Sequence, residues 1–351
     1  MDTYDYVYIA TISACYMVLR KRKGNKKKRL WIRPINVRRP LFGDFQHLFQ
    51  ELKEDEKMFF KYTRMNIHTF NKLLNILRLH LQKIHWRALS AEHRLIIMLR
   101  FLATGDQISS IAFAHRIGES TAYKVIKETC AITMKVLSPI YLKPPKEEDW
   151  KKIATGFWND WNFPNCIGAI DGKHFVIKAP PNSGSLYFNY KKIFSIVLLA
   201  VCDHQYKFII VDCGSYGSNS DGGIFAQSEF GKCLNRNDYL NIPVENFSRW
   251  RLFLRPICLK PQHTDTIIMA AVNLHNFLMT EKETSTNSYC PVNYVDSEDN
   301  TGHVTQGEWR LHVNNVNLNL RRTNVHRAVT EAYDQRDILS EYFSSPQGEV
   351  P

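Results

Sequence analysis

Residues 166–171 are Cys-Ile-Gly-Ala-Ile-Asp, a short apolar run that ends on a carboxylate. Two similar runs follow: FSIVLLAVC at 194–202, which precedes Asp203, and KFIIV at 207–211, which precedes Asp212. Short apolar runs bounded by turn residues are typical of buried strands. Residues 203–206 are a hairpin-length connection between the second and third runs. The sequence therefore predicts a small sheet in which each strand ends at an aspartate.

Carboxylates recur after the predicted strands. Asp171 ends the first strand, Asp221 stands at the start of a short helix after Gly217-Ser218-Asn219-Ser220, and Glu245 opens the next helical block. A single aspartate after a strand is often no more than a polar residue at the point where the strand reaches solvent. Carboxylates that converge from separate elements can instead hold hard divalent cations through their oxygens. Two such ions activate a nucleophile and stabilise the leaving oxygen in phosphodiester cleavage.

The chain upstream of this sheet has helical periodicity. Apolar residues fall on one face over 70–81, Ser90 can cap the next helix, and two shorter helices are predicted over 108–117 and 120–136. Pro139, with Pro144 and Pro145, is predicted to end this helical region. The last two helices have the outline of a helix-turn-helix, and an ordinary pair of bundle helices is the alternative. The predicted DNA-binding residues are Ser120, Thr121, Tyr123, Lys124 and Lys127.

A basic segment near the N-terminus carries most of the net charge. Eleven lysines and arginines and no acid lie within 20–39, so the net charge of +12 falls to about +1 when they are set aside. Dense basic clusters favour a nuclear localisation signal or a nonspecific DNA-binding arm, and a solvated tail without a partner is the third interpretation. The predicted nuclear localisation residues are Arg20, Lys21, Arg22, Lys23, Lys26, Lys27, Lys28 and Arg29.

No membrane or disulfide-stabilised class is predicted. The apolar run at 6–19 is shorter than the roughly 20 residues that span a bilayer, and the basic residues follow it rather than precede it. Eight cysteines show no C-x-x-C pair, which argues against a zinc finger and favours a reducing, intracellular compartment.

Several blocks in order carry a family resemblance. CIGAIDGKHFVIKAP at 166–180, FIIVDCGSYGSNSDGGIF at 208–225 and MAAVNLHNFL at 269–278 resemble PIF/Harbinger transposases and the nucleases derived from them, members of the DDE endonuclease superfamily. The resemblance implies an RNase H-like fold and DNA cleavage with Mg²⁺ or Mn²⁺. It further implies that Asp171 and Glu245 are catalytic metal ligands, that Asp221 is an additional ligand, and that a separate DNA-binding partner protein assists nuclear entry.

The chain departs from the pattern of this family between Asp221 and Glu245. A fourth strand that ends in the second catalytic aspartate belongs there, but only 24 positions separate the two residues and no suitable apolar run lies between them. We infer an internal deletion near Pro243 and Val244. The consequences are an exposed sheet edge beside the first strand and fewer oxygens to offset two cations.

The predicted fold class is α+β, with a helical bundle ahead of an RNase H-like DDE domain whose mixed sheet is flanked by helices and lacks its fourth strand. The predicted segments are a disordered basic leader (1–40), a helical domain (41–145), the nuclease domain (155–281), and a polar linker with a C-terminal helix (282–351). The leading hypothesis is a nuclear, metal-dependent DNA endonuclease, weakened in this chain. The alternative is a noncatalytic DNA-binding protein that retains a truncated nuclease domain.

Overall fold

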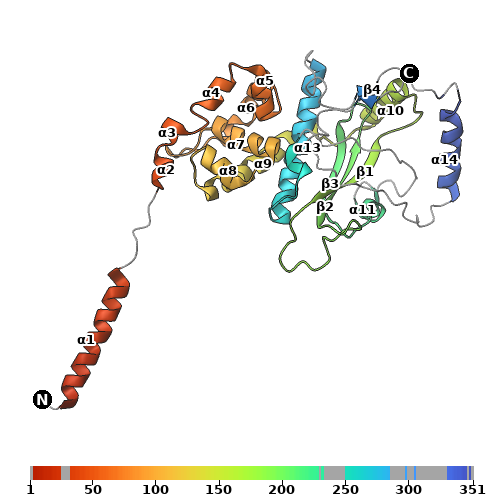
Figure 1. Ribbon diagram of the computed structural model, residues 1–351. Helices are drawn as coiled ribbons and strands as arrows, with labels where there is room; N and C mark the ends of the chain where they lie inside the picture. Colours follow the sequence, from red (N-terminus) through yellow and green to blue (C-terminus); the bar gives the residue numbers. More distant parts are fainter. Residues whose placement is uncertain are drawn as a thin grey trace.

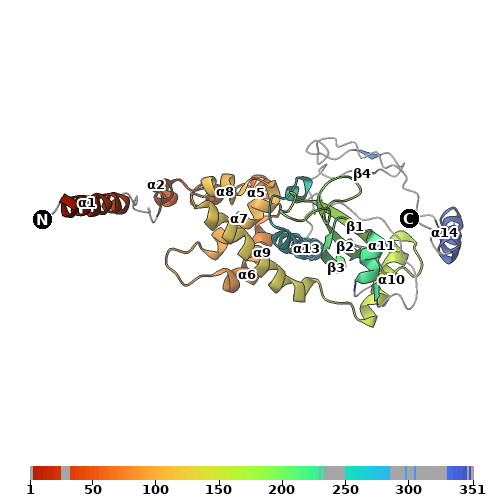
Figure 2. The same cartoon turned by 90° about the horizontal axis from the view of Figure 1, so that it is seen from below.

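The computed structural model describes residues 3–24, 32–228, 231–232, 250–284, 297–298, 304–305, 330–345 and 348. A bundle of helices precedes a small sheet, and one long helix, α13 (Pro261–Thr284), lies between them (Figure 1). The turned view shows the same order, with α13 beside both the bundle and the strands (Figure 2). The described part is therefore an α+β protein, as the sequence predicts.

The bundle is built around α7, which is buried on nearly every side. Ser90 caps this helix by accepting a hydrogen bond from the His93 N–H at 3.2 Å, and the run from Leu95 to Leu99 is fully buried. A helix that is apolar all round belongs at the centre of a bundle. The helices of this half are α2 (Pro34–Val37), α3 (Arg39–Phe42), α4 (Leu48–Leu52), α5 (Glu56–Thr63), α6 (Ile67–Leu81), α7 (Ala91–Thr104), α8 (Ile108–Ala114) and α9 (Glu119–Tyr141).

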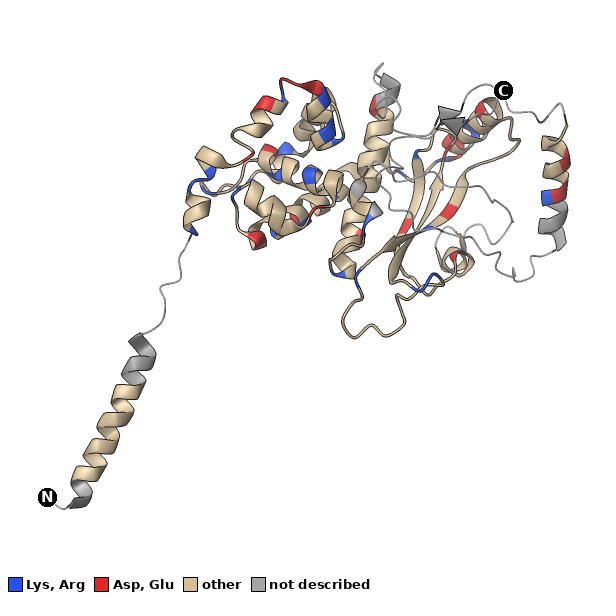
Figure 3. Ribbon diagram, in the orientation of Figure 1, with Lys and Arg blue, Asp and Glu red and all other residues tan. Residues whose placement is uncertain are grey.

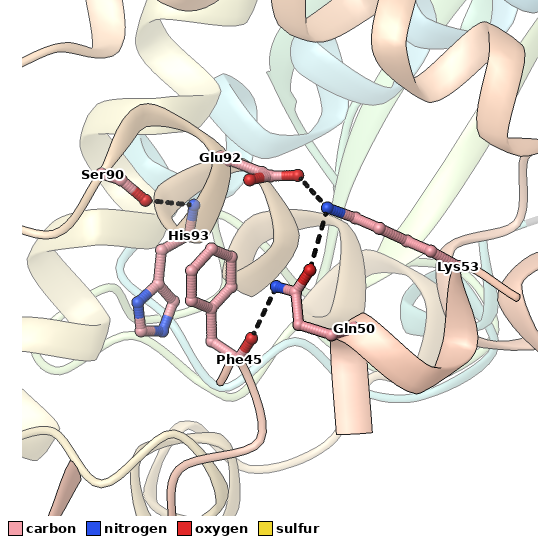
Figure 4. A network of polar contacts seen from close by, with 6 residues as sticks. All are labelled: Phe45, Gln50, Lys53, Ser90, Glu92 and His93. Atoms are coloured by element: carbon pink, nitrogen blue, oxygen red, sulfur yellow. Dashed lines mark hydrogen bonds and ion pairs between the residues drawn. The ribbon is translucent and has the colours of Figure 1, made fainter. Parts of the chain in front are cut away.

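Polar contacts fasten α4 to the start of α7. Lys53 lies 2.7 Å from the Glu92 carboxylate and 3.3 Å from the Gln50 side chain, which in turn donates to the Phe45 carbonyl (Figure 4). The Phe45 ring stacks on the His93 imidazole with centroids 4.1 Å apart. Both basic and acidic positions occur along the helices of the bundle (Figure 3).

Three antiparallel strands form the sheet, in the order β1 (Ala169–Val176), β2 (Ser195–Cys202), β3 (Phe208–Tyr216). All eight residues of β2 are buried, because β2 is the central strand and helices cover both faces. Phe175 and Leu198 pack toward Ile268 of α13, whereas Ile170 and Leu199 pack toward Ile224 of α11 (Asp221–Gln227). This alternation decides which side chains of β1 can share a site.

The remaining described elements lie around the sheet. Helix α10 (Glu147–Trp161) contacts the β2–β3 turn, where the Trp161 indole donates to the His204 carbonyl at 3.1 Å. Residue Ile257 makes a parallel bridge to Ile177, just beyond the end of β1. The other elements are η1 (Arg251–Leu254), β4 (Ser297–Glu298), β5 (Val304–Thr305) and α14 (Thr330–Phe343).

Several sequence predictions differ from the structure in their bounds. Strand β1 continues through Gly172-Lys173-His174, so Asp171 lies within the strand rather than at its end. Helix α9 begins after its N-cap Gly118, close to the predicted start, and runs past Pro139 to Tyr141. The proline therefore does not end the helix at its own position; the helix ends two residues after it.

Two further predictions concern the disordered leader and the missing fourth strand. Residues Thr3–Gly24 of the leader, predicted to be disordered, form the helix α1, in keeping with a run that has no proline and no glycine before position 24. All described side chains of α1 are exposed, and no helix in the described ranges is long and apolar enough to cross a bilayer. The inferred deletion near Pro243 and Val244 lies outside the described residues. Over the described part, the named strands are all antiparallel and Ile177–Ile257 is the one parallel pairing.

Candidate functional site

Two of the predicted carboxylates meet at β1. Asp171 is exposed on this strand, and Asp221, the first residue of α11, lies directly over the neighbouring Gly172. A Cβ atom at position 172 would stand 2.0 Å from Asp221 Oδ1, so only glycine admits the carboxylate here. Burial, and then the negative charge of Asp171, raise the pKa of Asp221. Gly172 thus lets the Asp221 carboxylate approach β1 one residue along the strand from Asp171.

The two carboxylates approach β1 from opposite sides. Gly172 belongs to the face that α11 covers, whereas Asp171 pairs with Ala200 and belongs to the face toward α13. Because β1 is an edge strand of the three-stranded sheet, the Asp171 side chain remains open to solvent. Their charges nevertheless interact, because the negative charge of Asp171 adds to burial in raising the pKa of Asp221.

Basic groups adjoin these acids, and sequence reasoning did not identify them. Lys173 stands two residues from Asp171 on the same face, and its pKa is lowered mainly by burial, against the opposing effect of Asp171. Lys191, from the loop before β2, contributes a further lowering of the pKa of both Lys173 and His174. The doubled lysine of Tyr190-Lys191-Lys192 ahead of a predicted strand was the available sequence signal. The site is therefore an acidic pair beside lysines, not an isolated acidic cluster.

A buried hydrogen-bond chain fixes the loop that carries Lys191. His174 Nδ1 lies 2.9 Å from Ser195 Oγ, which also accepts a hydrogen bond from Asn189 Nδ2 at 2.9 Å. Asn189 is 3% exposed and Ser195 is fully buried, so this chain is a support for the loop rather than an exposed nucleophile. His174 lies on the α11 face of β1, next but one to Gly172.

The carboxylate oxygens suit a hard cation of the kind that the family resemblance implies. Asp171 and Asp221 would provide oxygen ligands, and a positive ion would oppose the burial and the negative charge of Asp171 that together raise the pKa of Asp221. The third predicted ligand, Glu245, lies outside the described residues. Within the described ranges, no three His, Cys, Asp or Glu side chains gather closely enough to hold a metal ion. The described residues thus offer two carboxylates near β1 as candidate ligands, on opposite faces of the strand, and no complete cation site.

The predicted helix-turn-helix residues lie at the start of α9. Ser120, Thr121, Lys124 and Lys127 are exposed there, and Lys124 lies 3.7 Å from Glu128. Tyr123 is partly buried, because its ring meets His263 of α13 edge-on at 5.9 Å. The role of these residues in DNA binding stays a prediction. Of the predicted nuclear localisation residues, Arg20–Lys23 belong to α1, whose side chains are not described at these positions, and Lys26–Arg29 lie outside the described residues.

A further carboxyl group, Asp265 of α13, is partly buried against β3. Its Oδ2 would lie 3.3 Å from a Cβ atom at Gly214, and its Oδ1 has no hydrogen-bond partner among the described residues. Burial raises the pKa of Asp265 to about 6. Burial raises the pKa values of Cys213 and Tyr187, and the negative charge of Asp265 adds to both shifts. This group is therefore a local source of instability at neutral pH.

We predict that Asp265→Asn stabilises the chain at pH 7. The folded pKa of about 6 exceeds the unfolded value of 3.8, so the folded state loses stability as the pH rises from 3.8 to 6. Allowing for solvent screening of a partly exposed group, the gain is about 1 to 2 kcal/mol at pH 7. Urea unfolding at pH 7 and pH 4 measures it. The gain should vanish at pH 4, and a gain that is the same at both values would contradict this account.

Comparison with known families places the site in a class. Residues 170–246 match the profile of the DDE superfamily endonuclease. The matched segment begins next to Asp171 and includes Asp221 and Glu245, all three predicted metal ligands. The resemblance that the sequence motifs indicated is therefore confirmed: the segment is related to DDE superfamily endonucleases.

Individual relatives agree with this class. The chain is 30% identical over 154 residues to the Arabidopsis thaliana protein named "Antagonist of like heterochromatin protein 1", an alignment that covers 43% of this chain and 39% of the relative. It is 26% identical over 142 residues to "Putative nuclease HARBI1" of Rattus norvegicus, covering 40% of this chain and 41% of the relative. The alignments thus span about two fifths of these relatives. No solved structure matches.

Proposed function

We propose that this chain is a Harbinger-derived DNA endonuclease that depends on a divalent metal, Mg²⁺ or Mn²⁺. The observation that carries the proposal is the placement of Asp221 over Gly172, beside Asp171, within the segment that matches the DDE endonucleases. In this proposal Asp171 and Glu245 are the catalytic ligands, and Asp221 supports them. DNA is the substrate, and the nucleus is the site of action.

Each side chain has a defined task in such a reaction. The bound cation supplies Lewis-acid stabilisation of the negative charge that develops on the phosphate oxygens. Asp171 and Asp221 hold the cation, and Gly172 keeps the space that the Asp221 carboxylate occupies. Lys173 lies beside Asp171 and offsets part of its charge before any cation is present. The chain thus provides ligand oxygens and a fixed geometry at the edge of β1.

A second candidate function is noncatalytic DNA binding with a truncated nuclease domain. It is favoured by the sequence between Asp221 and Glu245, which has no run that would supply the second catalytic aspartate of the family. It is also favoured by the approach of Asp171 and Asp221 from opposite faces of β1. In that case the exposed lysines of α9 and the basic segment at 20–39 bind phosphates. The predicted partner protein and nuclear entry belong to both candidates.

Nicking of supercoiled plasmid with Mg²⁺ or Mn²⁺ distinguishes the two. We expect metal-dependent nicking that Asp171→Asn lowers by at least about 100-fold, because the substitution removes a ligand charge. Asp212→Asn is the matched control, since Asp212 is an exposed aspartate of β3 that no part of the proposal uses. Equal rates for the unaltered chain and Asp171→Asn would refute the nuclease and favour the noncatalytic candidate.

A further inference from the structure

A short turn displays an aromatic ring and a lysine next to the acidic pair. The turn consists of residues 189–193, where Asn189 N–H donates to the Ile193 carbonyl at 2.9 Å. Asn189 Oδ1 accepts from the backbone N–H groups of Lys191 and Ile193 at 2.9 and 3.2 Å. Lys192 has a left-handed backbone with φ of 62°. These contacts hold the segment in one conformation. We call residues 189–193 the 189–193 turn.

Hydrogen bonds fix the buried side of the 189–193 turn, and its other side is exposed to solvent. Asn189 also donates to Ser195 Oγ, which bonds to His174 on β1, so the buried side of the turn is joined to the strand that carries Asp171. Tyr190 is 69% exposed, and Lys191 is exposed beside it. The Lys191 ammonium group lies 5.4 Å from the Tyr190 ring centroid. The turn thus presents an aromatic ring and a positive charge to solvent on a fixed support.

The 189–193 turn adjoins the same face of β1 as Asp221. The Tyr190 ring meets the His174 imidazole edge-on at 5.7 Å. His174 and Gly172 are next but one on β1, so they share a face, and Asp221 lies over Gly172. Next-but-one residues of a strand are about 7 Å apart. The turn therefore borders the face of β1 on which the Asp221 carboxylate lies.

We propose that the 189–193 turn binds the DNA strand next to the link that is cleaved, with an unstacked base on the Tyr190 ring and the adjoining phosphate on Lys191. Aromatic rings receive bases of any sequence, and a lysine neutralises a phosphate without specifying a base. This inference rests on the proposed function and names how that site holds its substrate. Tyr190 and Lys191 are positioning residues, because they place the strand while the carboxylates act on it.

Binding of the full chain to a labelled oligonucleotide without divalent metal tests this inference. Fluorescence anisotropy should show that Tyr190→Ala weakens binding to a single strand about tenfold, while Tyr190→Phe keeps it. Lys191→Ala should reduce the slope of log affinity against log salt by about one phosphate contact. Lys152→Ala, which removes an exposed lysine of α10, is the matched control.

The outcomes separate this inference from the nuclease proposal. Losses for Tyr190→Ala and Lys191→Ala no greater than for Lys152→Ala would overturn the inference, whatever the plasmid assay gives. Losses as expected, together with no metal-dependent nicking, would leave the strand contact in place and reject the nuclease. Both side chains are exposed, so thermal unfolding of these variants should match that of the unaltered chain. A tenfold loss for Tyr190→Phe as well would contradict stacking on the ring.

Discussion

Acidification from pH 7 to pH 5 is expected to destabilise the helical bundle by about 4 kcal/mol through two histidines. His93 of α7 and His115, which follows α8, are 4% and 0% exposed, and their ring nitrogens Nε2 and Nδ1 lie 3.3 Å apart. Burial is the main cause that lowers the pKa of His93 to about 2 and of His115 to about 4. Both rings are therefore neutral in the folded state at pH 5.

The sign and size of this effect follow from the unfolded state. Both folded pKa values lie below the ordinary value of 6.5, so below pH 6.5 the unfolded chain binds more protons and stability falls as the pH falls. At pH 5 each neutral histidine costs about 2 kcal/mol relative to pH 7, because the ordinary value lies 1.5 units above pH 5. After burial, positive charge on His115 and Arg39 disfavours protonation of His93, and the positive charge of Arg100 disfavours protonation of His115.

A double variant isolates the pair. His93→Phe with His115→Leu removes both titrating groups and keeps an aromatic ring against Phe45. We expect the loss of unfolding free energy between pH 7 and pH 5 to shrink by about 4 kcal/mol in this variant, measured by urea unfolding followed by circular dichroism. The exposed pair His80→Phe with His85→Leu should keep the loss of the unaltered chain. The same pH dependence in both double variants would contradict the account.

Hydrophobic patterning predicted the elements of this fold better than their ends. The run at 194–202 became β2, and the periodic residues at 70–81 became α6, because each pattern buries a single face or a whole strand. Strand β1 extends through polar Gly172-Lys173-His174, where pairing with β2 outweighs composition. The paired residues of β1 and β2 are distant in sequence, so a local sequence pattern does not predict where the strand ends.

At the candidate site, too, the sequence predicted some residues and missed others. The sequence located Asp171 and Asp221 through turn and strand signals, and the structure brings them together at Gly172. Lys191 was not predicted, because its position depends on the hydrogen bonds that join Asn189, Ser195 and His174. Side-chain contacts between residues 6 and 21 positions apart have no signature in spacing or composition. Glu245 stays a prediction.

The bundle and the sheet are joined through one asparagine of α13. Asn276 is 2% exposed; its Oδ1 accepts from the Phe208 N–H of β3, and its Nδ2 donates to the carbonyls of Phe208 and of Tyr141 at the end of α9, each at 2.8 Å. Asn276→Leu removes all three hydrogen bonds and buries an apolar group against backbone polar atoms. We expect it to lower the free energy of unfolding by about 3 kcal/mol or more.

Asn273, one turn earlier on the same helix, is the matched control for this prediction. It is also fully buried, but its Nδ2 donates only to the Met269 carbonyl of its own helix, and its Oδ1 has no partner among the described residues. Replacing a buried polar group that is only partly satisfied costs little, so Asn273→Leu should change the free energy of unfolding by less than about 1 kcal/mol. Guanidinium unfolding of both variants makes the comparison. Equal losses would mean that packing of the larger leucine, rather than the three hydrogen bonds, decides the effect at Asn276.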